Sequence, residues 1–556
     1  MPKSPSPAGP LTVTGRRGRV LPVLAVLAAV AVYLNALDNP FVYDDFRTVR
    51  DNPTITDPGN LAAIVGGDAT RPLVNLTFAL DRAAWGPGPF GFHLTNVLLH
   101  AVNVWLLYTL ALALAGDRRR GTLGPEVAAF VTAAAFAVHP MMTQAVGFIS
   151  GRAEPLCAVF FLAALLAARR WLVERRPAWL LAAIGLWVPA LLSKEIAVTW
   201  PVVVLLYDLL VLEDTPARRR ARVLRVYVPA AVVLVGFAWL RLHVLSGEYA
   251  DHQGVFWRHV LVELEALRQY VSLLVVPAGQ SIFHGLTAID QPFSAAGLRM
   301  LAWAAALVAL TVIVRRRAPL ASFGLGWFLV GLVPSAVLVI FNLGEPMAEH
   351  RVYLASCGFF VAVGAVAARA LDLAAQRGAT ARLAMRAALV GWLILLAGLT
   401  VSRNAVWGDP VALWLEAVGR SPDIWVPHVG LGQSLHAAGQ REEAVVAYRR
   451  AIDLRASQPE PYVLLGSCLI ELGRPDEAAL VFEDLRRVAP RSADPFNGLG
   501  AVALFGGRHA EAKAYFEKAL ELEPGNRSAL AWLQRLAALD AGVPATGVMG
   551  PAATPR

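Results

Sequence analysis

Long apolar runs alternate with short polar segments over the first 403 residues of this 556-residue chain. One further segment, 257–277, is apolar but carries Glu263, Glu265 and Arg268 near its middle, a heavy cost at the centre of a bilayer. We therefore expect it to form an amphipathic helix on the outer membrane surface, with a twelfth span as the alternative. We interpret the other apolar runs as eleven transmembrane helices, at 20–37, 94–115, 125–138, 155–168, 178–192, 196–212, 226–240, 298–314, 320–341, 352–371 and 387–401.

Arginine clusters between the runs set the orientation. With eleven spans all of them fall on one side, which the positive-inside rule makes cytoplasmic; they lie at 118–120, 169–176, 218–225, 315–317 and 377–386. The basic tail 1–19 is then cytoplasmic and the first run is an uncleaved anchor, with a cleaved signal peptide as a minor alternative. We expect a multi-pass protein of the inner (plasma) membrane with its C-terminal region outside the cytoplasm.

After residue 403 the chain becomes charged and alanine-rich, with a period of 34 residues. This spacing, with small residues for helix contact, glycine for the turn and an aromatic residue between repeats, is the tetratricopeptide pattern. It repeats Leu431-Gly432 at 465–466 and 499–500, Gly439 at 473 and 507, Ala444 at 478 and 512, and Tyr448 as Phe482 and Phe516. We expect a linker with a degenerate half repeat at 404–424, three repeats at 425–526, a capping helix at 527–540 and a disordered tail at 541–556. Such arrays bind peptides or proteins; a stabilising appendage is the alternative.

Composition supports a membrane protein, since 56% of the residues are hydrophobic and 16% are charged. The net charge of +9 comes mostly from the arginine clusters rather than one basic face, which indicates membrane topology and argues against nucleic acid. Cys157, Cys357 and Cys468 are too scattered for a disulfide framework or zinc cluster. We expect an all-α protein: a multispanning membrane domain at 20–403 followed by a helical solenoid.

Ionisable residues gather at the predicted outer ends of the spans, whereas the inner ends carry almost only arginine. Along the second span, polar residues follow one helix face, which must meet either neighbouring helices or a wet cavity. We favour an outer cavity that binds a substrate. Its candidate residues are Asp44 and Asp45 in the first outer loop (38–93), Arg71, His93, Asn96, His100, His139, Arg152, Glu154, Lys194, Glu195, Glu349, Arg351 and Tyr353.

A carboxylate pair beside cations at a lipid–water boundary suits a reaction between a lipid phosphate and a hydrophilic acceptor. An aspartate can accept the proton of an attacking hydroxyl or hold a divalent cation. Arginine and lysine can neutralise a phosphate leaving group. Charge pattern alone does not separate sugar transfer from phosphate-group transfer, and it leaves a metal at Asp44 and Asp45 open.

Several motifs in this order resemble the TMTC family, the transmembrane and tetratricopeptide repeat containing proteins. They are Tyr43-Asp44-Asp45, Arg71-Pro72-Leu73, Gly91-Phe92-His93, His139-Pro140, Gly151-Arg152-Ala153-Glu154, Lys194-Glu195 and Glu349-His350-Arg351, all ahead of the repeats. The resemblance implies a protein O-mannosyltransferase of the multispanning GT-C class, inverting, with a dolichyl-phosphate sugar donor and a catalytic aspartate in the first outer loop. Of Asp44 and Asp45, we slightly favour Asp45 as catalytic.

The chain departs from the family in three ways. It has about three and a half repeats rather than a long array, and Gln144 stands where the family leads us to expect an acidic residue. Its arginine-rich, lysine-poor composition is typical of a GC-rich bacterial genome, so we expect a polyprenyl-phosphate sugar as donor, with mannose as the favoured sugar. The acceptor would be serine or threonine hydroxyls of an extracytoplasmic protein. The alternatives are a transferase acting on envelope glycans or lipids, and a non-catalytic scaffold whose repeats assemble envelope proteins.

Overall fold

The computed structural model describes residues 16–117, 124–212, 227–245, 256–286, 291, 293–340, 345 and 347–540. Every regular element within these ranges is helical, as the all-α prediction requires. The chain divides into two compact units between Asp409 and Pro410, inside the predicted linker. Residues 1–15, the tail 541–556 and the arginine clusters at 118–120 and 218–225 lie outside the described residues.

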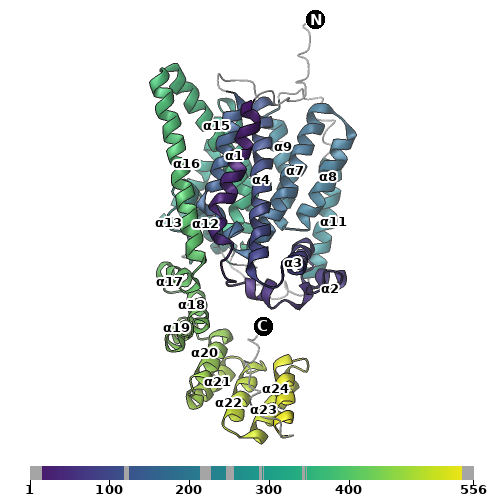
Figure 1. The fold of residues 1–556 in the computed structure, drawn as a ribbon, viewed down its shortest axis with the longest axis vertical. Helices are drawn as coiled ribbons and strands as arrows, with labels where there is room; N and C mark the ends of the chain where they lie inside the picture. Colours follow the sequence, from purple (N-terminus) through teal and green to yellow (C-terminus); the bar gives the residue numbers. More distant parts are fainter. Residues whose placement is uncertain are drawn as a thin grey trace. The chain divides into compact units, whose positions relative to one another are not determined.

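The first unit is a bundle of long helices with short outer helices at one end (Figure 1). Each of the eleven predicted runs overlaps a helix of the bundle, of 11 to 29 residues. These helices are α1 (Arg16–Val32), α4 (Pro89–Asp117), α5 (Pro125–Val138), α7 (Ala153–Glu174), α8 (Pro177–Leu191), α9 (Trp200–Leu210), α11 (Val228–Leu245), α13 (Ala295–Ile313), α14 (Pro319–Ile340), α15 (Tyr353–Gln376) and α16 (Ala379–Trp407). Among the described helices, six are long and apolar enough to cross a membrane, or seven if the bent pair Pro125–Val138 and Pro140–Val146 is one span. The count of eleven spans stays a prediction.

The helices begin and end where the sequence favours it. Helices α4, α5, α8 and α14 all start at a proline, whose missing N–H costs nothing in the first turn. The segment 257–277 forms helix α12 (Phe256–Val275), on which Arg268 pairs with Glu265 at 2.6 Å. Its position on the membrane surface stays a prediction.

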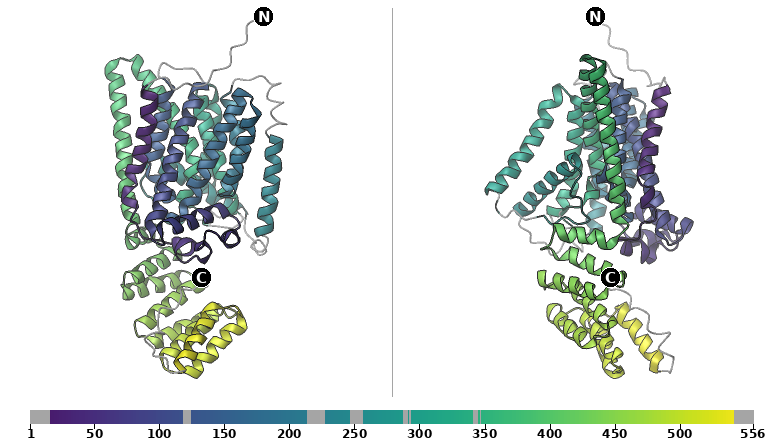
Figure 2. Two further views of the ribbon diagram at one scale, coloured as in Figure 1. Left: turned by 45° about the vertical axis from the view of Figure 1, so that its right-hand side comes forward. Right: turned by 60° about the vertical axis from the view of Figure 1, so that its left-hand side comes forward.

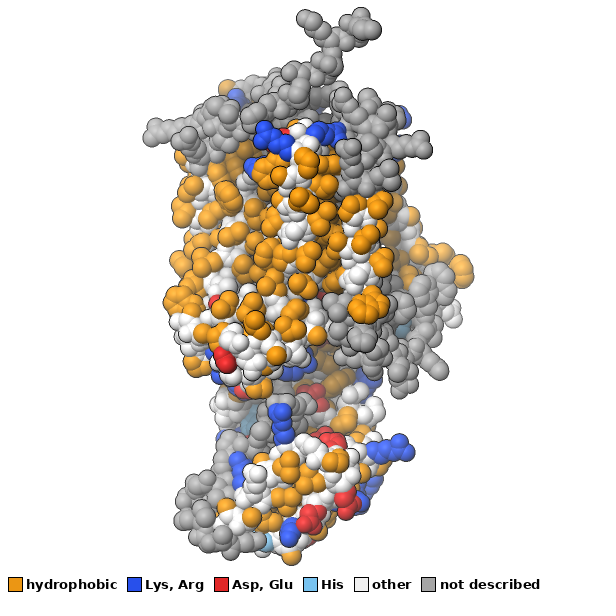
Figure 3. All heavy atoms as spheres, turned by 90° about the vertical axis from the view of Figure 1, so that its right-hand side faces the viewer, with side chains coloured by type: hydrophobic (Ala, Val, Ile, Leu, Met, Phe, Trp, Pro, Cys, Tyr) orange, Lys and Arg blue, Asp and Glu red, His pale blue; other side chains and the backbone are white. Residues whose placement is uncertain are grey.

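Hydrophobic side chains cover the flank of the first unit, and charged ones gather toward its ends (Figure 3). Helix α16 stands at the edge of the bundle beside α1 (Figure 2). Its apolar stretch is largely exposed, whereas those of α4, α7 and α15 are mostly buried. An exposed apolar belt of this kind is stable in lipid and unstable in water, which supports a membrane location.

At one end of the bundle, hydrogen bonds to a single carboxylate join the ends of three helices. Asp117 at the end of α4 accepts two hydrogen bonds from Arg169 on α7, at 2.6 and 2.8 Å. The hydroxyl of Tyr207, on α9, donates to the same carboxylate at 2.7 Å. Three helices that the arginine pattern predicts to end on the cytoplasmic side therefore end together.

The second unit consists of helical hairpins at the predicted period. Its helices are α17 (Pro410–Arg420), α18 (Trp425–Ala437), α19 (Arg441–Leu454), α20 (Pro459–Glu471), α21 (Pro475–Val488), α22 (Asp494–Phe505), α23 (His509–Leu522) and α24 (Arg527–Asp540). Gly439 turns between the helices of the first repeat with φ +81°. A Cβ on Gly466 would meet the ring of Phe482, so the small residue lets the two helices of its repeat approach closely. Helix α17 lies in the segment predicted as a half repeat, and α24 lies in the segment predicted as a cap.

Candidate active site

Loops that are far apart in the sequence meet at the end of the bundle opposite the Asp117 cluster. The connection after α1 contains a π-helical turn, Phe46–Arg50, and is followed by the outer helices α2 (Leu61–Gly67) and α3 (Pro72–Trp85). It contacts the segments 139–152, 194–199 and 345–352 through the hydrogen bonds and ion pairs described below. The predicted gathering of ionisable residues at one end of the spans is thus present in the fold.

Asp45 is completely buried, and both of its carboxylate oxygens accept hydrogen bonds. Oδ1 accepts from the backbone N–H of Ser150 at 2.8 Å and from its hydroxyl at 2.6 Å. Oδ2 accepts from the N–H of Val42 at 3.2 Å. Burial raises the pKa of Asp45 to about 7, although the hydrogen bonds from Ser150 and Val42 oppose that shift. Asp45 ties the first outer loop to the start of α7 and offers little room to a substrate.

Asp44 is placed differently, because its side chain is 43% exposed and its ion pair, with Arg47, is long at 3.9 Å. Burial raises the pKa of Asp44, while the charges of Arg47 and Arg71 lower it. The preceding residue, Tyr43, adopts φ +50°. A non-glycine residue in this left-handed region costs about 1–2 kcal/mol, so neighbouring contacts must hold the turn in place.

Two ion pairs lie beside this turn. Lys194 and Glu154 form a buried pair at 2.6 Å, and Arg71 approaches Glu195 at 3.5 Å. The guanidinium of Arg71 has one donor without a partner: within the described part of the chain, its buried Nε makes no hydrogen bond. A buried guanidinium donor without a partner is costly, which makes this position suited to an anion.

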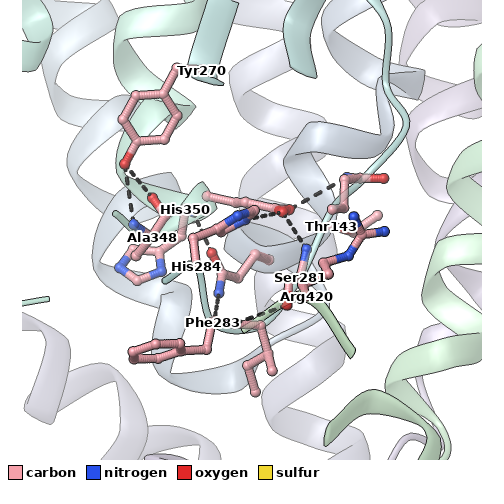
Figure 4. A network of polar contacts seen from close by, with 12 residues as sticks. Thr143, Tyr270, Ser281, Phe283, His284, Ala348, His350 and Arg420 are labelled. Carbon is pink, nitrogen blue, oxygen red and sulfur yellow. Dashed lines mark hydrogen bonds and ion pairs between the residues drawn. The ribbon is translucent and has the colours of Figure 1, made fainter. Parts of the chain in front are cut away.

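The segment before α15 anchors the outer end of the bundle (Figure 4). Glu349 is buried and accepts from the N–H of Ser281 at 2.7 Å and from Nε2 of His284 at 2.8 Å. The side-chain carbonyl of Gln144 accepts from the N–H of His350 at 2.7 Å, and its amide donates to the carbonyl of Ile282 at 3.2 Å. A carboxylate at position 144 could not make the second bond, which accounts for glutamine where the family resemblance suggested an acid.

The polar stripe on α4 is occupied by bonds to other segments. Nε2 of His93 donates to the carbonyl of Asn39 at 3.0 Å, and the side-chain oxygen of Asn96 accepts from Arg152 at 2.7 Å. Nε2 of His100 donates to the carbonyl of Ala137 at 3.1 Å.

Nδ1 of His100 therefore accepts from the hydroxyl of Tyr353 at 2.7 Å, which joins α4 to α15. Asn103 completes the stripe by donating to the carbonyl of Pro155 at 2.8 Å. All four polar residues of the stripe are buried, and each makes at least one hydrogen bond to another segment, although Nδ1 of His93 and Oδ1 of Asn103 have no hydrogen-bond partner among the described residues. His93, Asn96, His100 and Tyr353 are accordingly left out of the proposed binding site.

Arg152 and His139 are also fully buried. Arg152 pairs with Asp81 at 2.6 Å and donates to the carbonyl of Phe92 at 2.7 Å. His139 accepts from the N–H of Met141 at 3.2 Å and donates to the carbonyl of Leu274 at 3.1 Å. These side chains, like Glu349, connect elements of the bundle, and their role toward a substrate stays a prediction.

The candidate residues at this end that are at least partly exposed are Asp44, Arg71 and Arg351, and the buried Glu195 and Glu154–Lys194 pair lie near Arg71. The sequence analysis did not predict Glu345, Ser150 and His284 as site residues. Each of them is identified only by a hydrogen bond to a residue far away in the chain. Within the described residues, no group of three or more histidine, cysteine, aspartate or glutamate side chains is arranged to hold a metal ion.

Comparisons with known proteins follow the two units. Tetratricopeptide repeat family models match residues 435–499 and 493–526. Solved structures that match include MamA, at 21% identity over 24% of this chain and 72% of that chain, with a TM-score of 0.21. Another is YrrB, titled a TPR protein with an unusual peptide-binding site, at 21% identity over 30% of this chain and 84% of that chain, with a TM-score of 0.22.

Several curated relatives of this chain carry the name protein O-mannosyl-transferase. Tmtc1 of Drosophila melanogaster is 36% identical over 31% of this chain and 20% of that protein. F38B6.6 of Caenorhabditis elegans is 24% identical over 78% of this chain and 63% of that protein, and TMTC1 of Homo sapiens is 33% identical over 37% and 26%. The matches span less than two thirds of each of these relatives. They confirm the resemblance to the TMTC family that the sequence motifs predicted.

Proposed function

We propose that this chain is an integral membrane glycosyltransferase that transfers a sugar, with mannose favoured, from a polyprenyl-phosphate donor to serine or threonine hydroxyls of extracytoplasmic proteins. The observation that carries the proposal is an exposed carboxylate, Asp44, near a guanidinium, Arg71, whose buried Nε has no partner in the described residues. The names of the relatives support the reaction class. The arginine pattern supports the multi-pass inner-membrane orientation, with the site and the repeats outside the cytoplasm.

In the proposed reaction Asp44 is the base. Its carboxylate takes the proton of the acceptor hydroxyl as that oxygen attacks the anomeric carbon of the sugar. The bond between the anomeric carbon and the phosphate oxygen breaks, and the phosphate leaves with the electron pair. Arg71 and Arg351 would bind this phosphate and neutralise the charge that develops on it.

Asp45 serves as a positioning residue in this proposal, which reverses our initial slight preference for it as the catalytic residue. Both of its oxygens are engaged by Ser150 and Val42, so a substrate hydroxyl would have to displace an existing hydrogen bond to reach either one. Glu154, Lys194 and Glu195 set the charge around Arg71. The repeats would present the acceptor protein.

The test is transfer of radiolabelled mannose from polyprenyl-phosphate mannose into envelope protein by purified full-length protein in detergent. We expect label with the wild type, none above background with Asp44→Asn, and reduced transfer with Asp45→Asn. Arg50→Gln, an exposed change in the same loop, is the matched control and should retain activity.

A parallel reaction with a chelator tests the divalent-cation alternative. Label in lipid-linked oligosaccharide but not in protein would favour the envelope-glycan transferase. Equal labelling by wild type and Asp44→Asn would refute the assignment of the base. If a control transferase works and the wild type labels nothing with mannose, glucose or aminoarabinose lipids, the scaffold interpretation replaces the enzyme.

A further inference from the structure

The turn that carries Asp44 is held by a residue far away in the sequence. The hydroxyl of Tyr43 donates to Oε1 of Glu345 at 2.6 Å, across 302 positions of the chain. Tyr43 is the residue with the left-handed backbone, directly before Asp44. A bulky aromatic residue seldom keeps that conformation without a contact that fixes it.

Glu345 is itself fixed in place. Its backbone carbonyl accepts from Nη1 of Arg351 at 2.6 Å. Glu349, four positions later, is bonded to Ser281 and His284. The side-chain contact to Tyr43 therefore connects the first outer loop to a segment that is anchored on the bundle by several bonds.

The charges at this contact also relate Glu345 to the turn. Burial raises the pKa of Glu345, and the negative charge of Asp44 raises it further. The hydrogen bond from Tyr43 and the charge of Arg351 lower it. Glu345 is thus close enough to interact electrostatically with Asp44, and Oε1 of its carboxylate is engaged by Tyr43.

We propose that Glu345 is a positioning residue that acts through Tyr43 to hold Asp44 where it can reach the acceptor hydroxyl. This inference rests on the proposed function, because it takes Asp44 as the base. A base must lie within hydrogen-bonding reach of the proton that it removes. Loss of the Tyr43–Glu345 bond releases the strained turn and moves that carboxylate, while the hydrogen bond from Arg351 to the backbone carbonyl of Glu345 is retained.

The experiment compares Tyr43→Phe, Glu345→Ala, Glu345→Gln and the Tyr43→Phe/Glu345→Ala double variant as full-length protein. We expect Tyr43→Phe and Glu345→Ala each to lower kcat about tenfold, the effect of losing one hydrogen bond to a charged group. KM for polyprenyl-phosphate mannose should stay within about twofold, since donor binding is retained. Glu345→Gln keeps an acceptor oxygen and should restore most of kcat.

The double variant should be no worse than either single variant, because both remove the same bond. Multiplicative losses in the double variant, a Glu345→Gln variant as slow as Glu345→Ala, or a loss confined to KM would each overturn the proposal.

Amide hydrogen exchange over residues 42–50 gives a second measurement that does not depend on transfer. Faster exchange is expected in Tyr43→Phe and Glu345→Ala but not in Glu345→Gln. Tyr462→Phe, which removes a tyrosine hydroxyl bond in the second unit, is the matched control and should leave 42–50 unchanged. If the wild type transfers no sugar, the proposed function fails, while exchange still decides whether Glu345 holds the turn. Unchanged exchange in all variants would overturn that role.

Discussion

Removal of the carboxylate of Asp81 should destabilise the membrane unit strongly, because it leaves the buried positive charge of Arg152 without its ion-pair partner. The Arg152 side chain is 0% exposed, and its pair with Asp81 measures 2.6 Å. Its other hydrogen-bond partners, Asn96, Thr77 and the carbonyl of Phe92, are neutral, and the remaining negative charge that acts on it is that of Asp45. Arginine cannot lose its proton in a protein, so Asp81→Asn leaves a buried uncompensated cation. Breaking a buried pair in this way costs about 3–5 kcal/mol.

The assay is equilibrium unfolding of the full-length protein in mixed micelles with increasing SDS, followed by circular dichroism. Asp51→Asn is the matched control, because Asp51 pairs with Arg50 on the exposed surface at 51% and 48% side-chain exposure. Exposed pairs contribute about 0–1 kcal/mol. Adding Arg152→Met to Asp81→Asn should recover part of the loss, since it removes the stranded charge. A cost for Asp81→Asn as small as that of the control, or a double variant less stable than Asp81→Asn, would refute the structural role of Arg152.

Three further predictions concern the base, the outer anchor and the repeats. Burial raises the pKa of Asp44, and the base acts in its ionised form. The rate of transfer should therefore rise with pH, with a midpoint above the usual aspartate pKa of about 3.9. A rate that stays constant or falls as the pH rises through this range would contradict the prediction. Gln144→Glu removes an amide donor and should lower stability by about 1–3 kcal/mol in the same unfolding assay, whereas wild-type stability would argue against the anchor. Gly466→Ala places a Cβ against Phe482 and should cost about 1–3 kcal/mol, seen as faster proteolysis of the repeats; Gly525→Ala, which meets nothing, is the control, and equal proteolysis of both would contradict the packing argument.

The helices and the repeats could be predicted from sequence because their signals are local. Apolar runs bounded by arginine and proline coincide with helices, and the spacing of 34 residues places each helical hairpin of the second unit. Helix α12 was correctly separated from the other apolar runs as a helix with charged residues in its middle. Its depth in the membrane depends on the bilayer, to which local pattern is a weak guide.

The candidate site was predictable only in part, because polar residue types do not reveal their partners. The sequence located most of the ionisable residues that meet at the outer end. It could not separate Asp45, which is enclosed by Ser150, from Asp44, which is open. The two aspartates are adjacent and cannot be told apart by residue type. They differ in burial and hydrogen bonding, because Asp45 is bonded to Ser150, 105 positions away in the chain.

Exposure together with hydrogen bonding distinguishes the polar residues of the membrane unit. His100 and Arg152 have protein partners for their polar atoms, and in a low-dielectric interior such groups hold helices in register. Such a residue can serve a substrate only by giving up a bond that the fold needs. Arg71 differs from them because its side chain is 35% exposed while its Nε lacks a partner among the described residues, and Asp44 keeps an exposed carboxylate. Binding of a phosphate at Arg71 would remove an unfavourable feature of the free protein, so the same contact that recognises the donor would also stabilise the outer loops around Asp44.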